Sequence, residues 1–261
     1  MTATVIIPAR LASTRFPEKV LAAATGKPLV QHVVEAASGA AGVARVIVAT
    51  DHGRVAAALR PFGTHVVMTR VEHPNGTSRL AEAAAILGLG DDEVVVNAQG
   101  DEPEMAAGVI RAALEALGLP GVSVGTAAAP FDVDLDPRSP HLVKVVRAAD
   151  GTALYFSRAL IPHERDAGST GPGAVSPLRH VGVYAYRVGF LKRYVGLAPT
   201  PLELTERLEQ LRVLEHGYRI GVGVCEAAPE GIDTPEQYAA FVARYRAPAG
   251  SERATGRGAG A

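Results

Sequence analysis

The feature that most constrains the fold of this chain is a regular alternation of short apolar runs and helix-like segments through its first half. Runs such as Val46-Ile47-Val48 and Val94-Val95-Val96 are typical of strands buried inside a sheet. The predicted strands cover residues 4–8, 45–50, 65–68, 94–97 and 122–128, and the predicted helices cover residues 28–38, 54–60, 77–87 and 108–117. Strands that alternate with helices pair in parallel, so the pattern predicts an α/β fold whose mostly parallel sheet carries helices on both faces.

The rhythm changes at about residue 130. Residues 143–147, 153–156 and 181–187 are strand-like but are separated by loops, which predicts a smaller antiparallel excursion from the main sheet over about 130–200. Leucines recur at helical spacing over residues 201–216, and a strand at 219–225 and a helix at 235–245 follow.

Two stretches of biased composition complete this outline. Residues 166–177 are rich in Gly, Ser, Thr and Pro and predict a mobile loop beside the site. The interpretation is a single domain over residues 1–246, followed by a disordered Gly/Ala/Arg-rich tail over 247–261.

Composition limits the classes of partner. The 26 Lys and Arg residues almost balance the 27 Asp and Glu residues, so no global field attracts nucleic acid or acidic membranes. The lone Cys225 excludes an intramolecular disulfide and a thiolate metal cluster. No long apolar segment or signal-like start is present, so we expect a cytoplasmic protein without membrane insertion.

The first strand runs into a loop with the composition of a phosphate-binding site. The cations of this loop are Arg10, Arg15 and Lys19, and its hydroxyls are those of Ser13 and Thr14. Fixed positive charge and accessible backbone N–H groups bind phosphates well. A solvated basic loop is the alternative, but Pro8 and Pro17 restrict the loop and favour pre-organised charges.

A carboxylate follows the buried strand at residues 94–97. Ligands bind at the carboxyl ends of strands in open parallel sheets, where Asp101 lies here. An aspartate opposite a cationic phosphate loop suits Mg²⁺, which uses one or two protein carboxylates together with phosphate oxygens. A turn or helix cap is the alternative role. Asp233 begins a helix-start pattern, Asp-Thr-Pro-Glu, and is a second metal ligand only if folding brings it beside Asp101.

Three further polar groups have both a structural and a functional interpretation. Asn75 and Thr77 suit a helix cap or the reading of a base edge, and Arg79 offers a guanidinium to an anion. His180 is either a hydrogen-bonded core residue or a ligand contact. The series Glu203, Glu206 and Glu209 at three-residue spacing predicts one acidic stripe on a helix, usually solvated.

Taken together, the motifs resemble the 3-deoxy-manno-octulosonate (Kdo) cytidylyltransferase, or CMP-Kdo synthetase, family from residue 5 to about 243. The motifs are Ile7-Pro8-Ala9-Arg10, Ser13-Thr14-Arg15, Pro17-x-Lys19, Ala49-Thr50-Asp51, His73-x-x-Gly76-Thr77-x-Arg79, Asn97-x-Gln99-Gly100-Asp101-Glu102-Pro103, Ala153-Leu154-Tyr155-Phe156-Ser157-Arg158, Arg179-His180-x-Gly182-x-Tyr184, Leu208-Glu209-Gln210-Leu211-Arg212 and Gly231-x-Asp233-Thr234-Pro235-Glu236. Two positions depart from the family pattern, because Ser78 stands where an acidic residue is usual and Glu18 lies close to the expected phosphates.

The resemblance implies a Rossmann-like nucleotidyltransferase fold and the reaction CTP + Kdo → CMP-Kdo + pyrophosphate, which activates the sugar for lipopolysaccharide assembly. It implies catalytic roles for Arg10, Lys19, Asp101 and Asp233, with Mg²⁺ held by the two aspartates. The implied nucleotide-binding residues are Arg10, Ser13, Thr14, Arg15, Lys19, Asn75 and Thr77, and the implied sugar-binding residues are Arg79, Gln99, His180, Tyr184 and Glu209. Arg79 is expected near the sugar carboxylate, and the loop around Asn75 is expected to read cytosine.

The partners implied by the resemblance are CTP, an eight-carbon acid sugar and a second copy of the chain. The expected homodimer interface uses residues 181–186 and 190–195. Two alternatives remain: the same transfer to a related acid sugar, such as an amino-substituted Kdo or a sialic acid, and a catalytically silent nucleotide-binding homologue. The first loop argues against sialic acid, because it lacks the Arg-Gly-Gly-Ser-Lys sequence of enzymes that use that sugar.

Overall fold

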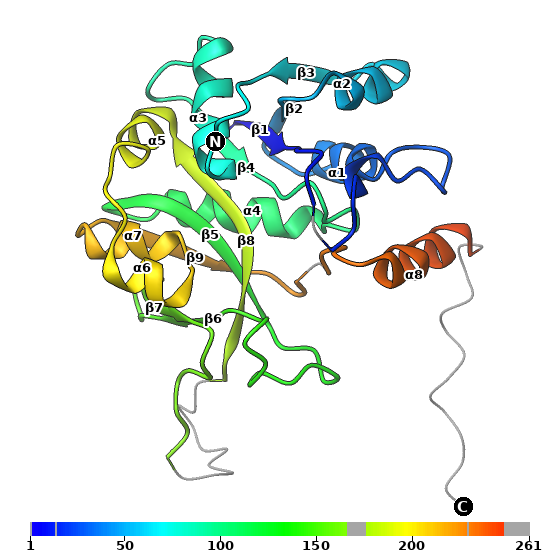
Figure 1. The fold of residues 1–261 in the computed structure, drawn as a ribbon. Coiled ribbons are helices and arrows are strands. Elements are labelled where there is room, and N and C mark those ends of the chain that lie inside the picture. Colours follow the sequence, from blue (N-terminus) through cyan, green and yellow to red (C-terminus); the bar gives the residue numbers. More distant parts are fainter. Residues whose placement is uncertain (1, 14, 166–175, 229, 248–261) are drawn as a thin grey trace, which may run out of the picture.

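The computed structural model describes residues 2–13, 15–165, 176–228 and 230–247. Thr14, most of the predicted mobile loop and all but the first residue of the predicted tail therefore lie outside the described residues. Within these residues, nine strands form one sheet, whose main path has the order β3-β2-β1-β4-β8-β5-β9 (Figure 1).

The bounds of most elements agree closely with the predicted segments. The strands are β1 (Ala3–Pro8), β2 (Val43–Thr50), β3 (His65–Met68), β4 (Val94–Asn97), β5 (Val122–Pro130), β6 (Lys144–Arg147), β7 (Ala153–Ser157), β8 (Leu178–Arg187) and β9 (Arg219–Val224). The α-helices are α1 (Leu29–Ser38), α2 (Gly53–Leu59), α3 (Gly76–Ile86), α4 (Ala107–Leu117), α5 (Val188–Tyr194), α6 (Pro201–Glu206), α7 (Gln210–Glu215) and α8 (Pro235–Arg246).

The α/β prediction is confirmed, but β8 does not lie where the sequence analysis put it. Strand β8 is antiparallel to both β4 and β5 and lies between them, in the middle of the main sheet. Only β6 and β7 lie off the main path, where β6 pairs with the start of β8. The long crossing strand therefore joins the parallel half of the sheet to the second half, rather than leaving it.

Alternate residues of each strand pack under different helices. Val5 and Ile7 of β1 belong to a core beneath α1, α2 and α4, whereas Ile6 belongs to the opposite core beneath α3, α5 and α7. Period-2 alternation sends successive side chains to opposite faces, and both faces here are apolar. Helices cover both faces of the sheet, as Figure 1 shows. This arrangement leaves the carboxyl ends of β1 and β4 side by side for function.

Glycines allow helix α4 to approach the sheet closely. A Cβ atom at Gly125 of β5 would lie 2.1 Å from the backbone oxygen of Ala113, and one at Gly223 of β9 would lie 2.2 Å from that of Ala112. These distances are below any tolerable van der Waals contact, so the two strand positions require glycine.

The predicted helix over residues 201–216 is divided in two. Arg207, between α6 and α7, has φ 55° in the left-handed region, which ends α6. Arg158 stabilises this end, because its Nε donates to the carbonyl of Glu206 at 2.8 Å. The predicted acidic stripe is therefore wrong, since its three glutamates lie on either side of a break and contact different parts of the protein.

The first of the two segments expected at the dimer interface is also corrected. Val181, Val183 and Ala185 of β8 are buried in the core of this chain, so segment 181–186 has no free apolar face to offer a partner. The adjoining segment forms helix α5, which the sequence analysis did not identify as a helix. None of the helices in the described part of the chain is long and apolar enough to span a membrane.

Candidate active site

The predicted phosphate loop borders a cavity of about 630 Å³ at the carboxyl ends of β1 and β4. Its lining includes Arg10, Ser13, Arg15, Lys19, Gln99, Asp101 and Asp233. Three sequence segments that lie far apart in the chain therefore meet here. The adjacency of β1 and β4 explains why, because each strand ends by directing its loop into the same space.

Lys19 is the centre of this cavity. Its Nζ donates to Asp101 Oδ2 at 2.5 Å, to Asp233 Oδ1 at 2.9 Å and to the Ile232 carbonyl at 3.0 Å. The other oxygen of Asp233 contacts Arg15 at 2.8 Å. The two aspartates therefore converge on one point despite their separation in sequence. The sequence analysis required this convergence before Asp233 could be considered a second metal ligand.

The charges of this group support one another. Burial alone would lower the pKa of Lys19, but Asp101 and Asp233 together raise it. Burial would raise the pKa of Asp233, yet Lys19 and Arg15 lower it below its usual range. Both partners consequently stay ionised, and the site is a compact arrangement of opposite charges.

Glu18, the residue that departs from the family pattern, does not oppose phosphate binding. Its backbone has φ 56°, and its carboxylate forms an ion pair with the guanidinium of Arg54. The side chain is thereby turned toward α2, and Arg54 neutralises its charge.

Arg79 lies outside the predicted sugar site. It is buried, and its guanidinium donates to Asp51 Oδ2 at 2.6 Å and to Thr69 Oγ1 at 2.6 Å. It borders a separate cavity of about 560 Å³, which also includes Asp51, His73, Arg10 and Ser13 in its lining. The expectation that Arg79 lies among the sugar-binding residues is corrected, because the buried ion pair with Asp51 holds it on the other side of the first loop.

Asn75 acts as a helix cap. Its side-chain oxygen accepts from the backbone N–H of Ser78 at 2.9 Å, which satisfies a free donor at the start of α3. Ser78 Oγ in turn lies 3.1 Å from His73 Nδ1. The structural alternative for Asn75 is confirmed, and its carbonyl oxygen is already used by the helix.

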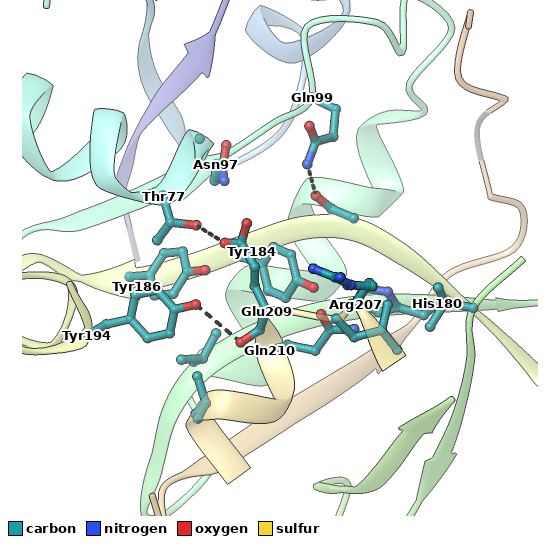
Figure 2. A pocket seen from close by; sticks show the side chains of 16 residues that line it. Thr77, Asn97, Gln99, His180, Tyr184, Tyr186, Tyr194, Arg207, Glu209 and Gln210 are labelled. Atoms are coloured by element: carbon teal, nitrogen blue, oxygen red, sulfur yellow. Dashed lines mark hydrogen bonds between the residues drawn. The ribbon is translucent and has the colours of Figure 1, made fainter. Parts of the chain in front are cut away.

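The remaining predicted sugar residues gather around a third, smaller cavity of about 280 Å³ (Figure 2). It includes Gln99, His180, Tyr184 and Glu209 in its lining, together with Thr77, which the resemblance had placed with the nucleotide. Tyr186 and Tyr194 form part of its wall, and the rings of Tyr184 and Tyr186 are stacked with centroids 6.1 Å apart. We call this space the tyrosine cavity and the space around Lys19 the phosphate cavity.

A β-bulge shapes the tyrosine cavity. The pairing of β5 with β8 shifts register between Thr126 and Ala127, which leaves Gly182 in the irregular part of β8. The Gly182 carbonyl accepts from Gln99 Nε2 at 3.2 Å. Gln99 lines both the phosphate cavity and the tyrosine cavity, so the two spaces meet at this residue.

His180 is a neutral member of the cavity wall. Burial lowers the pKa of His180 to about 3, and its ring packs edge-on against Phe156 with centroids 5.0 Å apart. Its Nε2 lies 3.1 Å from Thr126 Oγ1. At neutral pH the imidazole therefore supplies hydrogen bonding and shape, without a charge.

Glu209 is half-buried at the break that follows α6. Burial raises the pKa of its carboxyl group, and Thr77 Oγ1 donates to it at 3.3 Å. Tyr194 donates to the Glu209 carbonyl at 3.2 Å, which fixes the backbone. By contrast, Glu203 pairs with Arg212, and Glu206 accepts from Ser157 Oγ at 2.6 Å. Of the three glutamates, only Glu209 lines the cavity.

The sequence analysis missed several wall residues. Arg207 lines the tyrosine cavity from its left-handed position, and Asn97, Tyr186 and Tyr194 also face it. Asn97 stood inside a recognised motif, so its polarity at the end of an apolar strand was a usable signal. Tyr194 had no such signal, because it depends on the unpredicted helix α5.

Comparison with known proteins decides the family. Residues 4–220 match the family model described as cytidylyltransferase. The chain belongs to the cytidylyltransferase family. This cytidylyltransferase is 52% identical over 242 residues to the 3-deoxy-manno-octulosonate cytidylyltransferase of Alkalilimnicola ehrlichii, which covers 90% of this chain and 93% of the relative. It is also 52% identical over 241 residues to the enzyme of the same name from Herminiimonas arsenicoxydans, covering 90% and 96%.

A solved structure agrees over nearly the whole cytidylyltransferase chain. CMP:2-keto-3-deoxy-manno-octonic acid synthetase complexed with CTP superposes with a TM-score of 0.85 and 38% identity, covering 94% of this chain and 98% of that one. A cytidylyltransferase from Leptospira borgpetersenii has a TM-score of 0.58 at 12% identity, covering 93% and 85%. The second likeness shows the fold alone.

The donor set of the phosphate cavity suits a hard divalent cation. Asp101 and Asp233 both lie in contact with one cationic atom, Lys19 Nζ, so their oxygens already face a common point. In the described part of the chain, no group of three or more His, Cys, Asp or Glu side chains could hold a metal by itself. Two carboxylates completed by substrate phosphates match the way Mg²⁺ is bound.

Proposed function

We propose that this protein transfers CMP from CTP to the anomeric hydroxyl of Kdo, releasing pyrophosphate. The observation that carries the proposal is the meeting of two unlike cavities at Gln99, one lined by three cations and two carboxylates and the other walled largely by tyrosines and hydrogen-bonding groups. A nucleotide triphosphate needs the first, and a polyhydroxylated sugar needs the second. The names of relatives at 52% identity agree with this assignment.

The order of the cavities supports an assignment of each part of the substrates to one of them. Arg10 and Ser13 line both the phosphate cavity and the cavity bordered by Asp51 and Arg79. On the opposite flank, Gln99 is shared between the phosphate cavity and the tyrosine cavity. A CTP molecule would place its base beside Asp51 and its triphosphate over Lys19. The sugar would then reach the α-phosphate from the side of Gln99.

The reaction needs positioning and charge neutralisation more than a nucleophilic side chain. The sugar oxygen forms a bond to the α-phosphorus while the bond to the bridging β-phosphate oxygen breaks, and pyrophosphate leaves. Arg10, Arg15 and Lys19 would hold the departing charge. Asp101 and Asp233 would hold Mg²⁺, which would neutralise phosphate charge and make the attacking hydroxyl more acidic.

A turnover assay tests the proposal. Pyrophosphate release would be measured from CTP and Mg²⁺ with Kdo, an amino-substituted Kdo and a sialic acid in parallel, and each product identified by mass spectrometry. We expect release with Kdo and formation of CMP-Kdo. Release with only another acid sugar would reassign the substrate, and no release with any sugar would indicate a silent homologue.

We also propose a homodimer, which the family resemblance supports. Leu154 of β7 and Leu204 of α6 expose apolar surface, unlike the buried segment 181–186. Light scattering of the purified chain would give twice the monomer mass of 27.1 kDa if the proposal holds.

A further inference from the structure

Asn97 is a buried amide that the protein leaves without partners. It is the last residue of β4, and its exposed fraction is 4%. Its side-chain oxygen is fully buried and has no hydrogen-bond partner among the residues that the structure describes. Its backbone position, by contrast, is firmly placed between Ile6 of β1 and Tyr184 of β8.

Such a side chain calls for an explanation. A buried amide that loses its hydrogen bonds to water destabilises the fold, so buried polar groups in native proteins are almost always paired. Two buried hydroxyl groups on neighbouring elements follow that rule. Thr126 donates to the Val183 carbonyl at 2.8 Å, and Thr77 donates to the Glu209 carboxylate at 3.3 Å. The side-chain oxygen of Asn97 has no such partner in the described part of the chain.

The location of Asn97 indicates what would pair with it. Residues two apart on a strand share a face, so Asn97 lies on the side of the sheet to which Gln99, just beyond the strand, also turns. Both line the tyrosine cavity, as does Thr77. Figure 2 shows the Asn97 amide on the side of the cavity nearest Thr77, above the tyrosines in that view.

We propose that the Asn97 amide binds a hydroxyl group of the sugar substrate and is a specificity-determining residue of this enzyme. The inference rests on the proposed function and adds to it a recognition role for a residue outside the predicted set. A hydroxyl donates and accepts, so it satisfies the amide whichever of its two polar atoms faces the cavity. Rotation about the terminal torsion of Asn exchanges those atoms at little cost.

This chemistry makes the site selective for oxygenated sugars. A substrate that lacks the matching hydroxyl would leave the amide unpaired in the complex as well. Sites built around a buried polar group reject such analogues far more strongly than apolar pockets reject a missing methylene. Asn97 would therefore favour a polyhydroxylated ring over a deoxygenated one of similar shape.

The test compares Asn97→Val with Thr4→Val. Both substitutions replace a buried polar side chain by a β-branched apolar one, on neighbouring strands, but Thr4 lies at the start of β1 and already accepts from Arg45. For each variant, KM for Kdo, KM for CTP, kcat and the thermal midpoint would be measured. Asn97→Asp, which keeps the shape of the side chain, serves as a second variant.

For Asn97→Val we expect KM for Kdo to rise about 10- to 100-fold, with KM for CTP unchanged within about twofold. The thermal midpoint should not fall, because the change removes an unpaired buried amide. Asn97→Asp should raise KM for Kdo at least as much, since a carboxylate would repel the acid sugar. Thr4→Val should leave both KM values unchanged.

Two results would overturn the inference. One is an Asn97→Val enzyme that binds Kdo as the wild type does. The other is a lowered midpoint with both KM values raised in Asn97→Val and Asn97→Asp, which would make Asn97 a packing residue. Failure of the proposed function looks different, because the wild-type protein would then not convert Kdo at all.

Discussion

The phosphate cavity and the tyrosine cavity share Gln99 in their walls but have linings of different chemistry. The first holds three cations and two carboxylates, and Lys19 joins both acids through short hydrogen bonds. The second is less than half as large, and His180 and three tyrosines form much of its wall. Charged side chains dominate the lining of the first, whereas tyrosine rings and hydrogen-bonding groups make up most of the second, beside Arg207 and Glu209.

We expect this difference to keep the two proposed substrates in separate cavities. A triphosphate would lose most of its hydration in the tyrosine cavity without finding enough cations there. A sugar in the phosphate cavity would gain little from charges that water can screen. Substitutions in the two regions should therefore affect different kinetic constants, which the first two changes below test. The other two changes test the stability of the tyrosine cavity and its wall.

Asp101→Asn should have the largest effect. It removes one of the two carboxylates proposed to hold Mg²⁺, so we expect kcat to fall by about 10³-fold while the fold is retained. Pyrophosphate release at saturating Mg²⁺ measures it. Asp91→Asn, an exposed aspartate paired with Lys192, is the control and should be unaffected. Near-normal turnover by Asp101→Asn would refute the metal assignment.

Glu209→Gln should act on the sugar alone. The carboxylate lines the tyrosine cavity and accepts from Thr77, so we expect KM for Kdo to rise about 5- to 50-fold with KM for CTP unchanged. Steady-state kinetics with each substrate varied in turn gives both constants. The exposed Glu115→Gln on α4 is the matched control. Equal increases in both KM values would contradict the assignment of the two substrates to separate cavities.

His180→Gln should change the pH dependence of stability. Burial lowers the pKa of His180 to about 3, whereas an unfolded histidine titrates near 6.5. As pH falls below about 6.5, the unfolded chain binds a proton that the folded chain refuses until about pH 3. This proton lowers the free energy of unfolding by about 1.4 kcal/mol per pH unit over that window.

Glutamine does not take up a proton in the unfolded chain. The free energy of unfolding of His180→Gln should therefore fall less steeply than that of the wild type between pH 6.5 and pH 4. Urea denaturation at pH 7.5, 5.5 and 4.5 measures the difference. Parallel curves for the two proteins would mean that His180 takes up a proton in the folded state, which would contradict its role as a neutral member of the cavity wall.

Arg207→Gly should have the smallest effect on the fold. Arg207 has φ 55°, a conformation that costs a non-glycine residue about 1 kcal/mol. Glycine relieves that strain but adds freedom to the unfolded chain, so we expect stabilisation of at most about 1 kcal/mol. Thermal unfolding measures it, and Ala247→Gly, outside the helices, is the control. A clear loss of stability would show that the side chain of Arg207 supports the break between α6 and α7.

The same two regions differ in how well their sequences predict them. The strand, the cationic loop and the acidic turn of the phosphate cavity are each encoded within a few consecutive residues. Their meeting followed from one rule about the carboxyl ends of parallel strands. Only the approach of Asp233 to Lys19 required the folded chain, because helix α8 returns from the far end of the sequence.

The tyrosine cavity depends on long-range packing. Its wall requires β8 to cross the centre of the sheet, a bulge beside Gly182 and a helix break at Arg207. Leucine spacing over residues 201–216 favoured one continuous helix, and the contacts of Arg158 with the end of α6 override that local preference. Arg79 was misplaced for a similar reason, since its buried partner Asp51 comes from the distant turn after β2.

The most direct test of this account is a crystal structure of the protein with CTP, Mg²⁺ and a Kdo analogue that lacks the attacking hydroxyl. The account predicts the triphosphate over Lys19 between Arg10 and Arg15, the metal on Asp101 and Asp233, and the sugar beside Gln99 and His180. A triphosphate lying among the tyrosines, or a sugar held outside their cavity, would contradict it.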